Sequence, residues 1–200
     1  MLAIGTGEGT VLLVEAASGE ERRALVGHLA KVCSVSLSPD GRAVASAGDD
    51  RSWNLWDVAS GEHRMCSRVH DGSGGCTCLS RPGKPTKFDS WCPEWLHSSG
   101  VSTVTFSPCI KNGLKIATGG RAVTVWDVQT GVAESRMRWP VPALAGSAAT
   151  ALDLLWATHS PFWTDVHSLS FTSDGNTLAG GRCRDSAIYI WNVLTGNRLP

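Results

Sequence analysis

The stretch GHLAKVCSVSLSPDGRAVASAGDDRSWNLWD, residues 27–57, decides the fold of this chain. It opens with Gly27-His28 and closes with Trp56-Asp57, and a Ser-Pro-Asp-Gly turn occupies residues 38–41. Apolar residues alternate with polar ones on either side of that turn, which is the period-two pattern of half-buried strands. The stretch therefore predicts three short antiparallel strands, over residues 32–37, 43–46 and 52–57.

Three landmarks of this stretch recur further along the chain. A strand ending in Trp-Asp or Trp-Asn closes at residues 57, 127 and 192, and a turn with glycine follows each time. Upstream, a strand runs into a Pro or Asp-Gly turn in VSLSPDG, VTFSPCIKNG and LSFTSDG. A fainter copy begins the chain, where Val14-Glu15 stands in the Trp-Asp place. The chain is therefore a series of repeated sheet units.

The order of these pieces closely resembles the WD repeat, the unit of WD-repeat β-propellers. The resemblance implies an all-β fold, a partial WD-repeat β-propeller of four-stranded antiparallel blades with irregular insertions. Val14 and Trp56 lie 42 residues apart, within the ~40–45 of this repeat type. The next two intervals, of 70 and 65 residues, each fit one blade plus an insertion. The further residues that match the repeat signature are Trp126, Asp127, Asp185 and Trp191.

We expect a single partial propeller over residues 1–200. Its units lie at about 1–26, 27–70, 97–137 and 165–200, and its insertions at about 71–96 and 138–164. Alternation predicts further strands over residues 63–69, 101–106, 114–118, 122–127, 166–171, 177–179 and 187–192. The first unit supplies only the outer three strands of a blade and the last only the inner three. About three and a half blades result, fewer than the 4–8 of a closed propeller, so the chain is a piece of a larger propeller or a half that must associate.

WD repeats carry a buried hydrogen-bond network, and the resemblance assigns it to His28, Ser46, Asp50 and Trp56. A buried indole N–H needs an acceptor, and a hydroxyl can pass the chain of bonds on to an imidazole. The same residue types also make up a hydrolase triad. Ser46 lies in a predicted strand without a G-x-S-x-G elbow, and no oxyanion-hole segment is evident. We therefore expect a structural network with no catalytic residue.

The other units depart from this pattern. The third has Thr118 and Trp126 but no aspartate in the turn between them, and His97 is the candidate for its upstream histidine. The fourth keeps Asp185 and Trp191 but has a glycine in the serine place. The sequence therefore predicts one well-specified blade and three loose ones.

Arginines recur in the turns that precede each Trp-Asp strand. The functional interpretation is a basic rim that docks an acidic or phosphorylated partner segment through bidentate contacts. The alternative, which the neighbouring aspartates favour, is a set of ordinary solvated turn residues. The residues of this candidate partner-binding set are Arg51, Arg121, Arg182 and Arg184.

A metal site is the other constellation to weigh. The first insertion and its flanks collect His63, Cys66, His70, Cys76, Cys78, Cys92 and His97. Zinc sites favour C-x2–4-C pairs followed by a matched second pair, and Cys76-x-Cys78 is too tight for one. We therefore expect no metal and no cofactor.

The net charge, the N-terminal sequence and the cysteines limit which partners and which cell compartment to expect. The 18 Lys and Arg residues equal the 18 Asp and Glu residues, so no global field favours nucleic acid or an anionic membrane. The N-terminus lacks a basic leader with an A-x-A site, and no apolar run is long enough to span a membrane. The seven cysteines are irregularly spaced and indicate reduced thiols. We expect an intracellular protein, cytoplasmic or nuclear.

The resemblance implies a non-catalytic scaffold that binds protein partners, with self-association as a way to complete the propeller. Two alternatives stay open: a propeller-fold enzyme of the hydrolase type, and a degenerate truncated product without a stable fold. An enzyme would need carboxylates or metal ligands on the inner strands. Apolar residues stand there instead, at Val35, Leu37, Val104 and Phe106.

Overall fold

The computed structural model describes residues 1–68, 100–109, 113–120, 122–137, 166–182 and 187–200. These residues form fourteen strands in four antiparallel sheets and contain no helix. Within them, no helix is therefore long and apolar enough to cross a membrane. The two expected insertions, at about 71–96 and 138–164, lie outside the described residues.

Each sheet is built from strands consecutive in the chain. The first sheet holds β1 (Leu2–Gly5), β2 (Thr10–Val14) and β3 (Glu21–Val26). The second holds β4 (Val32–Leu37), β5 (Ala43–Gly48), β6 (Ser52–Asp57) and β7 (His63–Arg68). The third holds β8 (Thr103–Phe106), β9 (Lys115–Gly119), β10 (Val123–Asp127) and β11 (Ala133–Met137). The fourth holds β12 (Val166–Phe171), β13 (Thr177–Arg182) and β14 (Ile188–Asn192).

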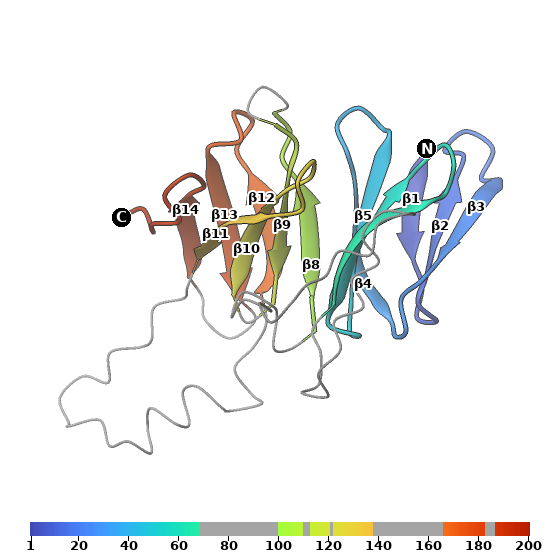
Figure 1. Cartoon of the computed structure of the whole chain (residues 1–200), viewed down its shortest axis with the longest axis horizontal. Helices are drawn as coiled ribbons and strands as arrows, with labels where there is room; N and C mark the ends of the chain where they lie inside the picture. The colour runs from blue at the N-terminus through green and yellow to red at the C-terminus, as the bar shows by residue number, and fades with distance from the viewer. Residues whose placement is uncertain (69–99, 110–112, 121, 138–165, 183–186) are drawn as a thin grey trace, which may run out of the picture.

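The four sheets stand in a row in chain order (Figure 1). The N-terminus lies with β1 at one end of the row and the C-terminus follows β14 at the other. The two inner sheets have four strands and the two end sheets have three. The fold is thus all-β, with the sheet arrangement of a partial propeller whose two ends stay apart.

Three apolar clusters hold the row together, one at each junction between neighbouring sheets. The first joins Leu13 of β2 to Trp56 of β6, and the second joins Trp53 of β6 to Trp126 of β10. The third joins Val125 of β10 to Trp191 of β14. Because each inner sheet packs against a neighbour on both faces, its two central strands are nearly continuous runs of buried residues.

The aspartate of each Trp-Asp pair orders the turn that follows its strand. Asp57 Oδ1 accepts the Ser60 amide at 2.8 Å, and Asp127 Oδ1 accepts the Thr130 amide at 2.7 Å. Asn192 does the same for Thr195 at 3.0 Å, so an amide replaces the carboxylate in the fourth sheet. These are local side-chain to backbone bonds of the kind that Asp and Asn favour in turns.

The last residues of the chain turn back along β14. Trp191 and Arg198 form an antiparallel bridge, and the Leu199 amide donates to the Ile190 carbonyl at 2.8 Å. This segment lies where the inner sheets carry their fourth strand. The fourth sheet, which the sequence predicts as three-stranded, therefore also begins a third pairing, with a fourth segment.

Candidate functional site

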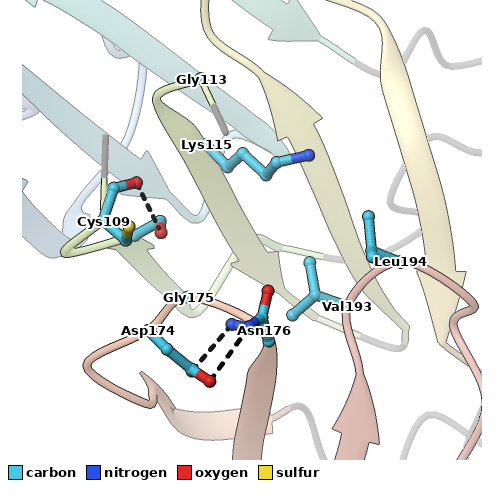
Figure 2. A pocket seen from close by; sticks show the side chains of 9 residues that line it. Cys109, Gly113, Lys115, Asp174, Gly175, Asn176, Val193 and Leu194 are labelled. Atoms are coloured by element: carbon cyan, nitrogen blue, oxygen red, sulfur yellow. Dashed lines mark hydrogen bonds between the residues drawn. The ribbon is translucent and has the colours of Figure 1, made fainter. Parts of the chain in front are cut away.

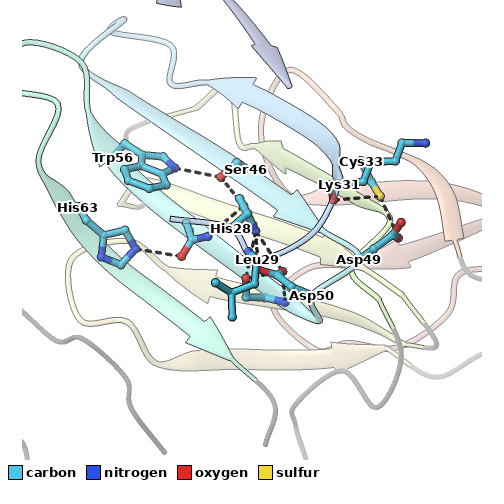
Figure 3. A network of polar contacts seen from close by, with 11 residues as sticks. His28, Leu29, Lys31, Cys33, Ser46, Asp49, Asp50, Trp56 and His63 are labelled. Atoms are coloured by element: carbon cyan, nitrogen blue, oxygen red, sulfur yellow. Dashed lines mark hydrogen bonds and ion pairs between the residues drawn. The ribbon is translucent and has the colours of Figure 1, made fainter. Parts of the chain in front are cut away.

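The polar network runs through the second sheet to the turn at one of its tips and joins segments from four parts of the chain (Figure 3). Trp56 Nε1, on β6, donates to Ser46 Oγ on β5 at 2.9 Å. Ser46 Oγ lies 2.8 Å from His28 Nε2, and His28 Nδ1 lies 3.1 Å from both carboxylate oxygens of Asp50. Since Asp50 can only accept, the proton belongs on Nδ1, and Nε2 then accepts the Ser46 hydroxyl proton.

Asp50 anchors this chain of bonds in the turn between β5 and β6. Its oxygens accept the Leu29 amide at 2.8 Å, the Ser52 amide at 3.1 Å and the Ser52 hydroxyl at 2.6 Å. Burial acts to raise the pKa of Asp50, but these bonds and that of His28 together hold it well below its ordinary value. Asp50 therefore ties the loop before β4 to the turn before β6.

The network also includes residues that the sequence interpretation missed. Asn54 Nδ2 lies 2.9 Å from His28 Nε2, and Asn54 Oδ1 lies 2.9 Å from His63 Nε2. The His63 ring also stands edge-on to Trp56, with 4.8 Å between ring centroids. Asn54 and Ser46 face each other across β5 and β6, so the strand register is the signal that could have found Asn54. The network thus extends across the sheet to its outermost strand.

Two glycines make room for the network. A Cβ on Gly27 would lie 2.6 Å from the Trp56 ring, and one on Gly48 would lie 2.7 Å from His28 Nδ1. Both distances are too short for a side chain to be accommodated without movement. The Gly27-His28 pair of the sequence therefore has a steric reason: the chain passes directly against the tryptophan.

The bonds from Ser46 through His28 to Asp50 have the order of a hydrolase triad, but the surroundings differ. Ser46 is fully buried and His28 is 5% exposed. The Ser46 oxygen already accepts the Trp56 indole proton. A substrate carbonyl has no approach to this hydroxyl, so these three residues hold the sheet tip together and leave no open nucleophile.

The third and fourth sheets carry reduced versions of this arrangement. Trp126 Nε1 donates to Thr118 Oγ1 at 2.8 Å, which repeats the bond between Trp56 and Ser46. In the fourth sheet Gly180 takes the serine place, and a Cβ there would lie 3.1 Å from the Trp191 ring. His97 and Asp185, the predicted partners in these units, lie outside the described residues.

Of the four arginines proposed as a basic rim, the structure describes the side chain of one. Arg51 is exposed at the tip of the turn between β5 and β6, with a φ of 63°. Arg121, Arg184 and the side chain of Arg182 lie outside the described residues. The basic rim therefore stays a prediction from the sequence.

Two further sets of residues bear on a cofactor or a metal. Of the seven histidines and cysteines weighed as zinc ligands, His63 and Cys66 are described and the other five lie outside the described residues. No three described His, Cys, Asp or Glu side chains gather as a metal site would require.

Cys33 lies near the network and donates from Sγ to Asp49 Oδ1 at 3.1 Å. Burial, and to a smaller extent this hydrogen bond, raises the pKa of the Cys33 thiol to about 11. At that pKa the thiol stays protonated and is a poor nucleophile.

A small hollow lies between the third and fourth sheets (Figure 2). Its cavity volume of about 10 Å³ is far below the ~300–1,000 Å³ of small-molecule pockets. Lys115 forms an ion pair with Glu134, and Asp174 accepts the Thr172 hydroxyl and the Asn176 amide within its own turn. The polar groups are thus already engaged. The lining residues are Ser107, Cys109, Gly113, Lys115, Asp174, Gly175, Asn176, Val193 and Leu194.

The repeated antiparallel sheets and the buried network define a partial β-propeller. The WD domain, G-beta repeat family matches residues 19–57 and 155–192, which include the Trp-Asp strand of the second sheet and the Trp-Asn strand of the fourth. These two matches and the similarity to a WD repeat-containing protein support a WD-repeat family for this chain.

Three curated proteins illustrate what the chain is similar to, and one of them is named as a WD repeat-containing protein. An uncharacterized WD repeat-containing protein of Schizosaccharomyces pombe is 25% identical over 96% of this chain and 52% of its own length. Autophagy-related protein 16 of Arabidopsis thaliana is 26% identical over 96% of this chain and 37% of its own. The small ribosomal subunit protein RACK1 of Brassica napus is 26% identical over 86% of this chain and 42% of its own length. The chain thus spans about half or less of the length of these relatives.

Proposed function

We propose that this chain is a non-catalytic WD-repeat scaffold that binds protein partners, as an intracellular partial propeller without a cofactor. In this proposal the units lie at about 1–26, 27–70, 97–137 and 165–200. The observation that carries the proposal is the buried network of the second sheet. Its polar groups hydrogen-bond to one another and so stabilise the loop and the turn at one end of the sheet.

That tip is the surface we propose for partner binding. Asp50 fixes the Leu29 amide and the turn that carries Arg51 at the same time, and Lys31 is tied in because its carbonyl accepts the Asp49 amide at 3.0 Å. Leu29 is 76% exposed, and Arg51 and Lys31 are also exposed. An exposed apolar side chain and two exposed cations on hydrogen-bonded neighbouring segments suit an acidic segment with an apolar anchor.

The arginine rim belongs to the same proposal as its outer part. Arg121, Arg182 and Arg184 occupy the corresponding turns of the third and fourth units in the sequence, so they would extend the cationic surface started by Arg51. Arginine suits such contacts because its planar fork binds a carboxylate or phosphate through two hydrogen bonds.

Affinity capture from cell extract with the wild-type chain and two variants tests the proposal. We expect Leu29→Asp combined with Arg51→Glu to lose a partner that the wild type retains, since the pair removes the apolar anchor and reverses a charge. Val132→Asp is the matched control, because Val132 is 60% exposed in the turn between β10 and β11, away from the tip. Equal capture by all three proteins would refute the tip as a binding surface.

A further inference from the structure

The same packing rule operates at all three junctions between sheets. The rule concerns the strand pairs β1–β2, β5–β6 and β9–β10. On the face that packs against the next sheet, small residues of the first strand pair with large apolar residues of the second. The pairs are Ala3 with Leu13 and Gly5 with Val11, then Ala45 with Leu55 and Ala47 with Trp53, then Ala117 with Val125 and Gly119 with Val123. The large residues in these pairs are at most 1% exposed.

The fourth sheet repeats this face and leaves it bare. Its pairs are Ala179 with Ile190 and Gly181 with Ile188, in the same register positions relative to Trp191. Ile190 is 40% exposed and Ile188 is 75% exposed. Two isoleucines beside small residues thus stand open to solvent where three equivalent faces are covered.

What covers those three faces is also the same each time. The next sheet presents an apolar residue paired with its repeat tryptophan: Val44 with Trp56, Ile116 with Trp126 and Leu178 with Trp191. These residues are at most 6% exposed. In the first sheet the equivalent pair is Leu2 with Val14, followed by Ile4 with Leu12.

That face of the first sheet is the second open one. Leu2 is 51% exposed, Ile4 is 46% exposed, and Leu12 and Val14 are half-buried. Figure 1 shows the first and fourth sheets at opposite ends of the row, so one chain cannot bring these two faces together without rearranging. Among the described sheets, one face of each kind is therefore uncovered, and the two lie at opposite ends of the row.

We propose that the face of Ile188 and Ile190 docks the face of Leu2 and Ile4 of a second copy of this chain, head to tail. Both faces are apolar, and the contact follows the rule that the three internal junctions obey. Two copies supply eight sheets, the upper end of the 4–8 blades with which propellers close. A head-to-tail contact that closes at two copies uses both open faces, and the second contact then forms within one complex.

The experiment measures mass in solution by sedimentation and light scattering for the wild-type chain and single variants. We expect a dimer of the wild type, and at least a tenfold weaker dimer for Ile188→Glu and for Leu2→Glu, since each places a charge in an apolar contact. Ile190→Glu and Ile4→Glu are the second variants of each face. Val132→Glu, in an exposed turn on neither face, is the control and should dimerise as the wild type does.

Mixing distinguishes head-to-tail docking from a symmetric contact. Ile188→Glu keeps an intact first sheet and Leu2→Glu keeps an intact fourth sheet, so together they should form a one-to-one complex that neither forms alone. No complex on mixing would overturn the head-to-tail arrangement. A wild-type chain that stays monomeric at ~100 μM, well above typical dimer dissociation constants, would overturn the proposal.

A third outcome would point to a covering segment of the same chain. If Ile188→Glu lowered the thermal midpoint of a monomer while leaving its mass unchanged, the face would be covered within one chain, and the proposal would fall. Because none of these variants touches Leu29 or Arg51, failure here is separate from failure of the proposed partner surface.

Discussion

The second and fourth sheets share a plan of strands but differ in what holds their tips. Both bury a tryptophan beside an aliphatic residue of the neighbouring strand, Trp56 with Val44 and Trp191 with Leu178. In the second sheet Ser46 links that tryptophan to a histidine and a carboxylate, whereas the fourth has Gly180 in the serine place. The buried tryptophan is thus common to both sheets, whereas the polar network around it is present in the second sheet and orders the turn there.

Of the variants that test this difference between the two sheets, removal of His28 should lower the free energy of unfolding most. His28→Ala leaves Ser46, Asn54 and Asp50 without their shared partner in a buried site, at an expected cost of about 3 kcal/mol in the free energy of unfolding. Urea denaturation measures it. The control is His167→Ala, at an exposed position of β12, which should change stability by less than ~0.5 kcal/mol. Similar values for both variants would show that the network contributes little.

Adding the missing hydroxyl to the fourth sheet tests the comparison from the other side. Gly180→Ser should destabilise the protein by about 1–3 kcal/mol, because its Cβ would lie 2.8 Å from the Leu169 side chain and 3.1 Å from Trp191. Gly181→Ser is the matched control, since nothing lies within 4 Å of a Cβ there. Thermal unfolding of the two variants measures the difference. If Gly180→Ser were stabilising, the fourth sheet would accommodate a serine at this position, and the steric argument would be wrong.

Acid should weaken the second sheet through Asp50. The pKa of Asp50 is lowered in the folded state, so the unfolded state binds more protons as the pH falls toward the ordinary aspartate value near ~4. Its stabilising contribution is therefore complete at neutral pH and is lost as the pH falls from about 5 toward the lower folded-state value.

The variant Asp50→Asn measures this contribution. We expect it to cost about 1.5 kcal/mol at pH 7, the size of a hydrogen bond to a charged group, and the difference from wild type to shrink toward pH 3. Urea midpoints at several pH values give the curve. For Glu20→Gln, at an exposed position between β2 and β3, the difference in stability from wild type should not change in this way with pH. A difference that stays constant with pH would contradict the assignment.

The smallest expected effect concerns the backbone of the tip. Arg51 has a φ of 63°, a conformation that costs a non-glycine residue about 1–2 kcal/mol. Arg51→Gly should therefore stabilise the protein by about 0.5 kcal/mol after the added freedom of the unfolded glycine is subtracted. Arg42→Gly, at an exposed position without a positive φ, should destabilise instead. Calorimetry of the two variants compares them directly.

Most strands could be predicted from alternation alone, and some ends could not. The predicted strands at 32–37, 52–57 and 166–171 coincide with β4, β6 and β12. The predictions at 43–46 and 177–179 were too short, because β5 runs to Gly48 and β13 to Arg182. Alanine and glycine have little strand propensity of their own, so pairing with both neighbours extends these strands beyond the local signal.

The candidate site shows the same division. Spacing and residue type identify His28, Ser46, Asp50 and Trp56, which the structure brings within hydrogen-bond distance. Asn54 and His63 carry no signature, since their contacts depend on which residues stand opposite each other across three strands. Register of this kind is set by the whole sheet, and a local pattern does not contain it.

The sequence by itself determined the repeat, the class of fold and the residues of one polar network. The reason is that tight turns, alternation and hydrogen-bonding side chains are local features that short stretches encode completely. The tertiary structure decided which faces are buried, because burial depends on what the neighbouring sheet presents. It also showed that the stretch from Gly27 to Asp57 is buried on both sides, while the two end sheets keep one apolar face open.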